Sequence, residues 1–365
     1  MFNTISIIGL GYIGLPTATM FAARKKKVIG VDINQDIVDI INQGKIHIIE
    51  PELDMLVQAS VVSGYLRATT TPEPAEAFII TVPTPFTAEH NPDLSYIEAA
   101  ANSLAPVLAK GDLVILESTS PIGTTEKLSN WLASARPDLT FPHQEQENAD
   151  IQIAYCPERV LPGRVMHELI NNDRVIGGMT RTATFMAAAL YKTFVQGDLV
   201  ATSAPTAELC KLVENSFRDV NIAYANELSV ICDKFDINVW ELISLANRHP
   251  RVNILQPGIG VGGHCIAVDP WFIIDIASEE TRIIRMAREV NESKPLWVLN
   301  KVKVAIDNIL VKKSGSTMAD IKVACLGLAF KANIDDLRES PAVEITQHIA
   351  DFGCQVLAVE PNIKI

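Results

Sequence analysis

The chain has 365 residues, of which 48% are hydrophobic and 20% charged, with a formal net charge of −12. This length allows two or three domains with sizeable cores and excludes a largely disordered chain. The acidic balance, interrupted only by one short basic run at Arg24–Lys27, argues against nucleic acid and anionic membranes as partners.

Six cysteines are spread singly along the chain, with no CxxC pair and no spacing typical of a metal site. Scattered single cysteines favour a reducing compartment, so we expect a cytoplasmic protein without a bound metal. The first residues have no basic region before their apolar run, and no apolar run approaches the ~20 residues of a membrane span. We therefore expect neither a signal peptide nor a membrane segment.

The first half of the chain predicts a doubly wound α/β sheet. Thr4–Ile8 reads as a buried strand, followed by a glycine turn, a helix and a second strand at Val28–Val31. Helical stretches separate several further apolar runs of strand length, which are Ala77–Pro83, Asp112–Thr119, Ile151–Glu158 and Arg174–Gly178. Such alternation is typical of a Rossmann-like fold.

The second half is mostly helical before it returns to the α/β pattern. Helices are expected at 205–235, 238–249 and 281–311, with Pro295 marking a start or a kink in the last one. Residues 312–320 resemble a linker, and a strand, a helix and a strand follow. We predict a Rossmann-like domain over 1–204, a central helical domain over 205–313 and an incomplete second Rossmann-like domain over 314–365.

Gly9, Gly11 and Gly14 form a G-x-G-x-x-G turn between the first strand and its helix. Asp32 closes the next strand 23 positions after Gly9, where an acidic residue binds the adenosine ribose of a dinucleotide. No arginine follows Asp32, and its carboxylate would repel a 2′-phosphate, so the pattern favours NAD over NADP. The alternative is a plain strand–helix turn.

Polar residues follow several predicted strands. Thr84 ends one strand, Ser118 and Thr119 end another, and Thr125 follows shortly after. These hydroxyls either face a ligand crevice at the carboxyl edge of the sheet or cap the next helices. Glu158 lies beyond a further strand as a candidate general base or a salt-bridge partner.

A polar stripe runs along the helix expected at 205–235. Glu208, Lys211, Asn215 and Arg218 fall within an arc of roughly 80° on one helix face. Such a stripe is more often a solvated face than a functional one. An asparagine inside a helix is nevertheless not chosen for its helix propensity.

Cys265 stands in the segment GVGGHCIAVDP, which covers residues 260–270. Because Pro270 suits a first helical turn, a helix is expected to begin near Cys265, placing Cys265 and Asp269 one turn apart on one face. Its N-terminus would favour a thiolate, and the preceding glycines would let a ligand approach closely. The alternative is a buried, inert cysteine.

Together these motifs resemble the UDP-glucose/GDP-mannose dehydrogenase family over essentially the whole chain. The matching segments, in the family's order, are the glycine fingerprint, VPTP, STSPIGT, PERVLPG, ELCKLVENSFRDVNIAYANE, GVGGHCIAVDP and FKANIDDLRESP. The wording of residues 248–272 is most similar to the branch that acts on UDP-N-acetyl-D-mannosamine.

The resemblance implies roles for individual residues. Cys265 corresponds to the nucleophile, Lys211 to a catalytic lysine, Asn215 and Asp269 to their polar partners, and Glu158 to a family glutamate. It implies NAD-binding residues in Gly9, Gly11, Tyr12, Ile13, Gly14, Asp32, Val82, Thr84, Thr119, Thr125 and Arg338. Substrate-binding residues are implied in Arg159, Val160, Lys211, Asn215, Arg218, His249, Arg251, Gly262 and Lys331. The UDP-glucose branch has a second glutamate where this chain has Pro162, so that role does not transfer.

The implied reaction is a four-electron oxidation of a UDP sugar at C6 through a cysteine thiohemiacetal and thioester. UDP-N-acetylglucosamine and UDP-glucose remain alternative substrates. A two-electron hydroxyacid dehydrogenase and an inactive protein that binds NAD and a nucleotide sugar remain alternative functions. The chain ends soon after a strand of its last α/β unit, so we expect the uridine-binding part to be shortened. The long central helix and the family resemblance both predict a homodimer.

Overall fold

The computed structural model describes residues 2–87, 90–161, 163–263, 265–313, 315–331, 334 and 336–363. The chain forms two compact units, Met1–Leu212 and Val213–Ile365, each of which is described by itself. No helix within the described ranges combines the length and hydrophobicity needed to cross a membrane.

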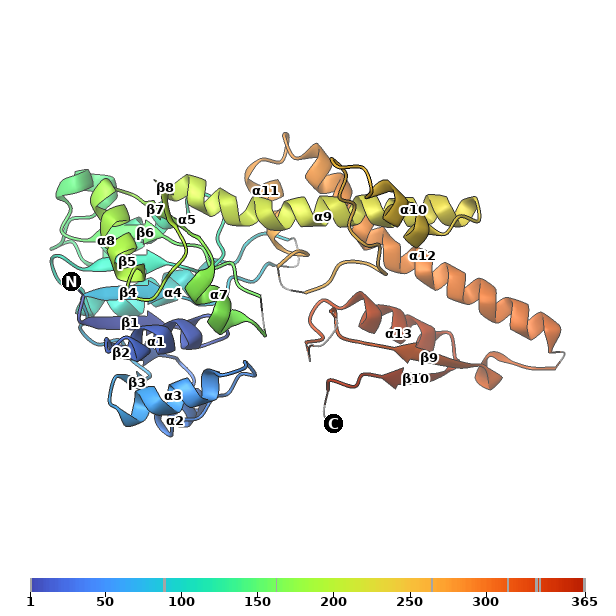
Figure 1. Cartoon of the computed structure of the whole chain (residues 1–365), viewed down its shortest axis with the longest axis horizontal. Coiled ribbons are helices and arrows are strands. Elements are labelled where there is room, and N and C mark those ends of the chain that lie inside the picture. Colours follow the sequence, from blue (N-terminus) through green and yellow to red (C-terminus); the bar gives the residue numbers. More distant parts are fainter. Residues whose placement is uncertain are drawn as a thin grey trace. The chain divides into compact units, whose positions relative to one another are not determined.

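The first unit is built on an eight-stranded sheet in the order β3-β2-β1-β4-β5-β6-β7-β8 (Figure 1). Its strands are β1 Thr4–Ile8, β2 Lys27–Val31, β3 Leu66–Thr69, β4 Ala77–Ile80, β5 Leu113–Leu116, β6 Gln152–Tyr155, β7 Arg174–Gly178 and β8 Leu199–Ser203. Neighbouring strands pair in parallel except β6 and β7, which pair antiparallel. The fold class expected from the sequence is therefore confirmed, with two reversed strands at one edge.

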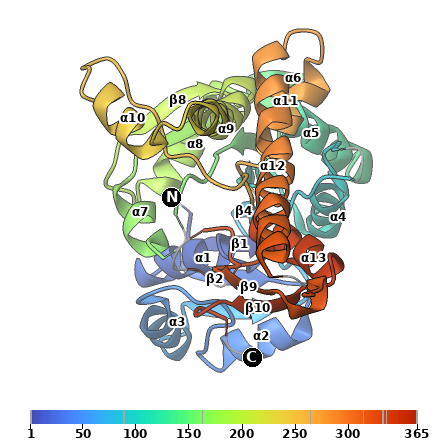
Figure 2. The ribbon, with the colours of Figure 1, turned by 90° about the vertical axis from the view of Figure 1, so that its right-hand side faces the viewer.

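Helices cover both faces of this sheet and enclose a buried core on each. One core joins the sheet to α1, α2, α3, α7 and α8, and the other joins it to α4, α5 and the start of α9. Figure 2 shows α4 and α5 on the opposite side of the sheet from α7 and α8. The helices are α1 Gly14–Ala23, α2 Gln35–Asn42, α3 Leu53–Val62, α4 Ser95–Leu104, α5 Thr124–Ala135, α6 Pro142–Glu145, α7 Val165–Asn171, α8 Arg181–Tyr191 and α9 Ala204–Lys234.

The second unit combines long helices with a small parallel sheet. It contains the greater part of α9, followed by α10 Val239–Ala246, α11 Asp269–Ile276, α12 Arg282–Lys312, β9 Lys322–Leu326, α13 Pro341–Asp351 and β10 Gln355–Val359. Leu299 of α12 packs with Ile345 and Ile349 of α13 in a small core below β9 and β10.

Three local expectations need correction. Pro295 lies inside a continuous α12 and does not start it. Helix α11 begins at Asp269, so Pro270 does occupy its first turn, but Cys265 precedes the helix and does not belong to it. Strands β3 and β8 were not expected, and they are the two edge strands of the large sheet.

Candidate active site

The three glycines of the first turn meet different requirements. Gly9 has φ +93°, which disfavours any residue with a side chain. A Cβ on Gly14 would lie 1.8 Å from the Gly9 carbonyl oxygen, whereas a Cβ on Gly11 would meet nothing within 4 Å. The protein itself therefore requires Gly9 and Gly14, and the open space at Gly11 fits the close approach of a dinucleotide pyrophosphate.

Asp32 stands directly after β2 and is fixed by two backbone donors. Its Oδ2 accepts a hydrogen bond from Leu10 N–H in the glycine turn at 3.0 Å, and its Oδ1 accepts one from Asn34 N–H at 3.0 Å. Each carboxylate oxygen keeps a second lone pair. The arrangement fits a ribose bound beside the glycine turn, in agreement with the sequence interpretation of NAD.

The predicted hydroxyls and their neighbours differ in what they contact. Ser118 Oγ donates to the carbonyl oxygen of Val82 at 2.7 Å, and Thr119 is half-buried. Thr84 Oγ1 is buried without a hydrogen-bond partner among the described residues. The bonding capacity of the Thr84 hydroxyl is thus unused within the described part of the chain.

Glu208 stabilises the start of α5, so neither Thr124 nor Thr125 caps that helix with its side chain. The Glu208 carboxylate accepts hydrogen bonds from Gly123 N–H and Thr125 N–H, both at 2.7 Å, and from Thr125 Oγ1 at 2.6 Å. Burial raises the pKa of Glu208, while the bonds from Thr125 and Gly123 lower it. The Thr125 hydroxyl is therefore engaged within the protein.

The polar stripe on α9 is not simply a solvated face. Glu208 is fully buried and Asn215 is 8% exposed, whereas Lys211 is half-buried and Arg218 is exposed. A solvated-face interpretation is therefore wrong for Glu208 and Asn215. A buried polar side chain within a helix needs a specific partner, and both residues have one.

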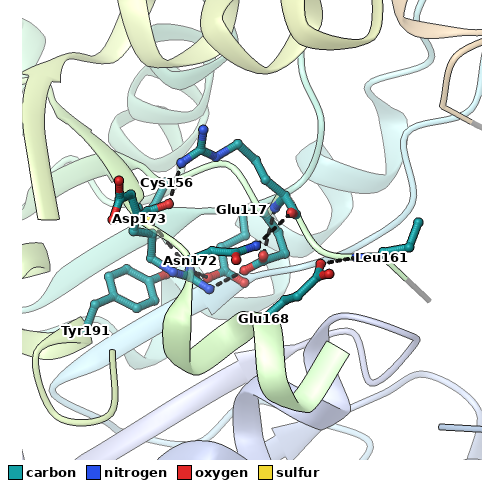
Figure 3. A network of polar contacts seen from close by, with 10 residues as sticks. Glu117, Cys156, Leu161, Glu168, Asn172, Asp173 and Tyr191 are labelled. Carbon is teal, nitrogen blue, oxygen red and sulfur yellow. Dashed lines mark hydrogen bonds and ion pairs between the residues drawn. The ribbon is translucent and has the colours of Figure 1, made fainter. Parts of the chain in front are cut away.

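Glu158 belongs to a buried charge network at the carboxyl ends of β5 and β6. Figure 3 shows Glu117 and Tyr191 of this network. It forms an ion pair with Arg174, the first residue of β7, and Arg174 also pairs with Glu117 at 2.8 Å. The Tyr191 hydroxyl donates to Glu117, and the Arg174 guanidinium lies 4.3 Å from the centre of the Tyr191 ring. Burial raises the pKa of Glu117, against the lowering effect of Arg174. The sequence allowed Glu158 to be a general base or a salt-bridge partner, and the structure shows it in a salt bridge with Arg174.

Carboxylates hold the loop that follows Glu158. Leu161 N–H donates to Glu168 at 2.8 Å (Figure 3), and Gly163 N–H and Val165 N–H both donate to Glu50 at 2.8 Å. In the same loop, the Arg159 guanidinium donates to the backbone carbonyl of Asp173, and Val160 packs against the core. Pro162 lies outside the described residues.

Cys265 lies in the turn that leads into α11. Asp269 N–H donates to the Cys265 carbonyl oxygen at 2.8 Å, so the two residues are one turn apart as expected although the helix starts only at Asp269. Asn215 Nδ2 of α9 donates to Asp269 Oδ2 at 2.6 Å. Cys265 is half-buried, whereas Asp269 is 2% exposed. This arrangement holds the acidic neighbour of the thiol in place.

The glycines before Cys265 serve protein packing, contrary to the expected close approach of a ligand. A Cβ on Gly262 would lie 2.3 Å from the Glu339 carbonyl oxygen, and a Cβ on Gly263 would lie 2.6 Å from the Phe330 ring. A Cβ on Gly260 would lie 2.9 Å from Pro341. At Gly262, therefore, the space that a substrate was expected to use is filled by the C-terminal segment.

The remaining candidate residues of the second unit lie in exposed loops. Asn247 closes the loop at 248–253 through bonds to both backbone groups of Ile254, at 2.7 and 2.9 Å, and this loop presents His249 and Arg251 to solvent. Lys331 is exposed, and Arg338 forms an ion pair with Asp336 at 2.6 Å. Sequence reasoning did not find Glu50, Glu117 or Arg174, although Glu117 carries a usable signal as a charge directly after an apolar strand.

A Rossmann-like sheet with a glycine turn and a fixed acidic residue after β2 defines the class of NAD-dependent dehydrogenases. The chain belongs to the UDP-glucose/GDP-mannose dehydrogenase family. Residues 3–195 match its NAD binding domain, 205–293 its central domain and 324–365 its UDP binding domain. The protein is therefore an NAD-dependent nucleotide-sugar dehydrogenase.

Individual relatives are similar over the whole chain. It is 64% identical to an NDP-N-acetyl-D-galactosaminuronic acid dehydrogenase of Ralstonia nicotianae, covering 100% of this chain and 84% of the relative. It is also 64% identical to the UDP-N-acetyl-D-mannosamine dehydrogenase of Escherichia coli K12, covering 99% and 86%. The solved UDP-D-ManNAc dehydrogenase of Pyrococcus horikoshii superposes with a TM-score of 0.92 at 41% identity, covering 99% and 84%.

Proposed function

We propose that this protein oxidises UDP-N-acetyl-D-mannosamine at C6 to the corresponding uronate, for use in bacterial surface polysaccharide. The substrate class follows from the family, and the choice of sugar is supported by the relatives of that name at 63–64% identity. The Ralstonia relative, equally similar at 64%, makes an N-acetylgalactosamine-type substrate the second candidate.

The proposed chemistry assigns a task to each residue near Cys265. When bound, NAD accepts the two hydrides that leave C6. The Cys265 thiolate adds to the aldehyde carbon formed by the first oxidation, and the resulting thiohemiacetal loses the second hydride to become a thioester. Water then attacks the thioester carbon, which releases the carboxylate and returns the thiol. Overall, one alcohol, one water and two NAD give one carboxylate, two NADH and protons.

Lys211 and Asn215 are proposed to stabilise the oxyanion of the tetrahedral intermediates, because a cation and an amide donor one helical turn apart face the same way. Asp269 or Glu158 is proposed to take the proton from water. The single observation that carries this proposal is the unit formed by Cys265, Asp269 and Asn215, in which a half-buried cysteine lies one turn from a buried, hydrogen-bonded carboxylate.

The test is the yield of NADH per UDP sugar in the parent and in Cys265→Ser. We expect two NADH per sugar for the parent. The serine variant is expected to give at most one, with aldehyde as the product, because an alkoxide forms far less readily than a thiolate. Cys354→Ser, at a partly buried cysteine in the core under β9 and β10, is the matched control. A serine variant that makes uronate at the parent rate would remove Cys265 as nucleophile.

A substrate panel separates the candidate sugars. The N-acetylmannosamine, N-acetylgalactosamine, N-acetylglucosamine and glucose derivatives of UDP are each supplied with NAD, and we expect the highest kcat/KM for the first. If only another of these sugars yields two NADH per molecule, the proposed reaction stands and the proposed substrate is replaced by that sugar. One NADH per molecule in the parent would point to a two-electron dehydrogenase.

Further features of the protein are proposed together with this function. The domains are 1–204 for NAD, 205–313 for catalysis and dimerisation, and 314–365 for UDP. The remaining NAD contacts are proposed at Tyr12, Ile13, Val82, Thr84, Thr119 and Arg338, and substrate contacts at Arg159, Val160, Arg218, His249, Arg251 and Lys331. A homodimer in the cytoplasm is proposed, which is consistent with the single cysteines and the family's biosynthetic reaction.

A further inference from the structure

Helix α9 carries a row of buried polar residues along its middle part. Asn215, Asp219 and Asn226 are spaced at four and seven residues, which places them within about 40° of one another around the helix axis. Their exposed fractions are 8%, 0% and 0%. Three buried polar side chains in one row need partners, and the partners of two of them lie on either side of Cys265 in the sequence.

Asn226 is held in a single orientation by a chain of hydrogen bonds that begins on α12. Arg288 Nη1 and Asn291 Nδ2 both donate to Asp219 Oδ1 at 2.8 Å. Asn291 Oδ1 therefore faces Asn226 and accepts a bond from its Nδ2 at 2.8 Å. The Asn226 Oδ1 therefore points away from Asn291, and it accepts a hydrogen bond from Gly258 N–H at 2.8 Å.

Gly258 opens the glycine-rich segment that leads to Cys265. Such a segment has little stiffness of its own, so contacts from outside must fix its course. Asn226 fixes it seven residues before Cys265, and Asn215 holds Asp269 four residues after Cys265. Two asparagines of α9, three helical turns apart, thus hold the cysteine segment by hydrogen bonds on both sides of Cys265.

We propose that Asn226 is a positioning residue for the Cys265 thiol, which it places through Gly258, and that Asn291, Asp219 and Arg288 keep its amide correctly oriented. The proposal rests on the function proposed above, because it concerns the thiol that traps the aldehyde. Asn226 is fully buried and acts only through the segment that it holds. Loss of the hydrogen bond between Gly258 and Asn226 slows the addition of the thiol to the aldehyde. Some aldehyde then leaves before the second hydride transfer.

Two substitutions at Asn226 and one control test this role. Asn226→Leu removes the acceptor for Gly258 N–H, whereas Asn226→Asp keeps that acceptor and replaces the donor to Asn291 with a second, acidic oxygen. Asn221→Ala is the control, because Asn221 lies on the same helix and its side chain donates only to its own helix, at the Phe217 carbonyl oxygen. NADH and UDP sugar consumed are measured together, and free aldehyde is quantified as its dinitrophenylhydrazone.

The leucine variant is expected to give between one and two NADH per sugar, with the deficit recovered as aldehyde. A misplacement of the thiol by ~1 Å slows its addition by about ten- to a hundred-fold. The aspartate and control variants are expected to give two NADH and no aldehyde. A merely structural asparagine would lower the rate or the stability without changing this ratio, so two NADH and no aldehyde from Asn226→Leu would overturn the proposal.

A second measurement does not depend on catalysis. The rate of Cys265 alkylation by iodoacetamide, read by peptide mass spectrometry, is expected to change in Asn226→Leu and to match the parent in Asn226→Asp. If the parent yields fewer than two NADH from every UDP sugar, the proposed function fails, and the alkylation rates still report whether Asn226 controls the thiol. If the parent yields two NADH but neither ratio nor alkylation responds to Asn226→Leu, the inference fails alone.

Discussion

Two aspartates of the first unit lie at opposite edges of the same sheet and have different surroundings. Asp32 follows β2 at the carboxyl edge, where two backbone N–H groups hold its carboxylate. Asp112 precedes β5 at the amino edge, is 6% exposed and accepts a hydrogen bond from Ala109 N–H at 2.7 Å. The first is proposed to bind the ribose of the dinucleotide, whereas the second is buried at a cost to stability.

Asp32→Ala is expected to weaken NAD binding by about 1–3 kcal/mol, the size of a lost charge-assisted hydrogen bond. Discrimination against NADP should relax, because the repulsion between the carboxylate and a 2′-phosphate disappears. Calorimetric titration with both dinucleotides measures these effects. Asp36→Ala, in the exposed first turn of α2, removes the same charge as a control, and equal losses from both variants would show a general charge effect.

Asp112→Asn is expected to stabilise the protein at alkaline pH. Burial raises the pKa of Asp112 to about 6, and the nearby Glu76 adds to the increase. As pH rises from about 4 to 6, the unfolded chain loses this proton while the folded chain keeps it, so stability falls and then stays lower. The asparagine variant avoids this cost, which amounts to about 1–3 kcal/mol above pH 6.

Urea unfolding at pH 4.5 and pH 8 measures the effect, because the gain should appear mainly at pH 8. Asp307→Asn, on the exposed face of α12, is the control. A stabilisation by Asp112→Asn that is the same at both pH values would contradict the assignment.

At the scale of elements, the turn between β1 and α1 contains one glycine required by protein packing, Gly14, and one that the ligand is expected to require, Gly11. Gly11→Ala is expected to leave the unfolding free energy near that of the parent, because its Cβ meets no protein atom within 4 Å. It should still abolish NAD binding, because the methyl group occupies the space of the pyrophosphate. Gly14→Ala is expected to destabilise the first unit by several kcal/mol, because backbone atoms of Gly9 block its Cβ.

Urea unfolding and NAD titration of both variants test this division. The expected pattern is a stable protein that fails to bind NAD for Gly11→Ala and an unstable one for Gly14→Ala. Normal NAD affinity in Gly11→Ala would mean that the dinucleotide does not approach this turn.

The elements that the sequence predicts correctly are those with strong local patterns. The central strands β1, β2, β4, β5 and β6 are dominated by apolar residues because both of their faces are largely buried. Strands β3 and β8 lie at the edges of the sheet, so LRAT carries an exposed Arg67 and LVATS is largely exposed. Without a continuous apolar run, neither differs from a loop in the sequence.

The same limit applies to the candidate site. Cys265, Asp269 and Asn215 are recognisable because their spacing and motifs are local or because they match a family. Glu158 pairs with Arg174, which is 16 residues away, and Asn226 bonds Gly258, which is 32 residues away. Only the tertiary fold brings these pairs together. The helix was expected to begin near Cys265, but a turn of three residues, 266–268, separates Cys265 from the first helical residue, Asp269.

At the scale of the whole molecule, the second unit exposes more large apolar side chains than a solvated surface normally does. On α9, Val213, Phe217 and Tyr224 are 43–69% exposed, and on α10, Trp240 and Leu245 are 55% and 59% exposed. Leu212 and Ala223 of the same helix are buried within the chain and do not add to this surface. The remaining exposed side chains support the proposed dimer.

Sedimentation at micromolar concentration is expected to give a species of about twice the chain mass of 39.9 kDa. Phe217→Glu combined with Trp240→Glu should shift it to the monomer, because two charges replace apolar contact area. Phe185→Glu, at a 75% exposed phenylalanine of α8 in the first unit, is the matched control. A parent that sediments as a monomer would contradict the dimer.

Strand β8 ends at Ser203 and α9 begins at Ala204, with no connecting residue between them. The direction in which Lys211 points from α9 is therefore set by the number of residues between it and the edge strand β8. The hydrogen bonds between Glu208 and the start of α5 fix the rotation of the helix at a second point. Each residue inserted or deleted between Ser203 and Glu208 would turn Lys211 by 100° and move it by 1.5 Å relative to the strand. The number of residues in this junction is therefore as closely constrained as the lysine that it orients.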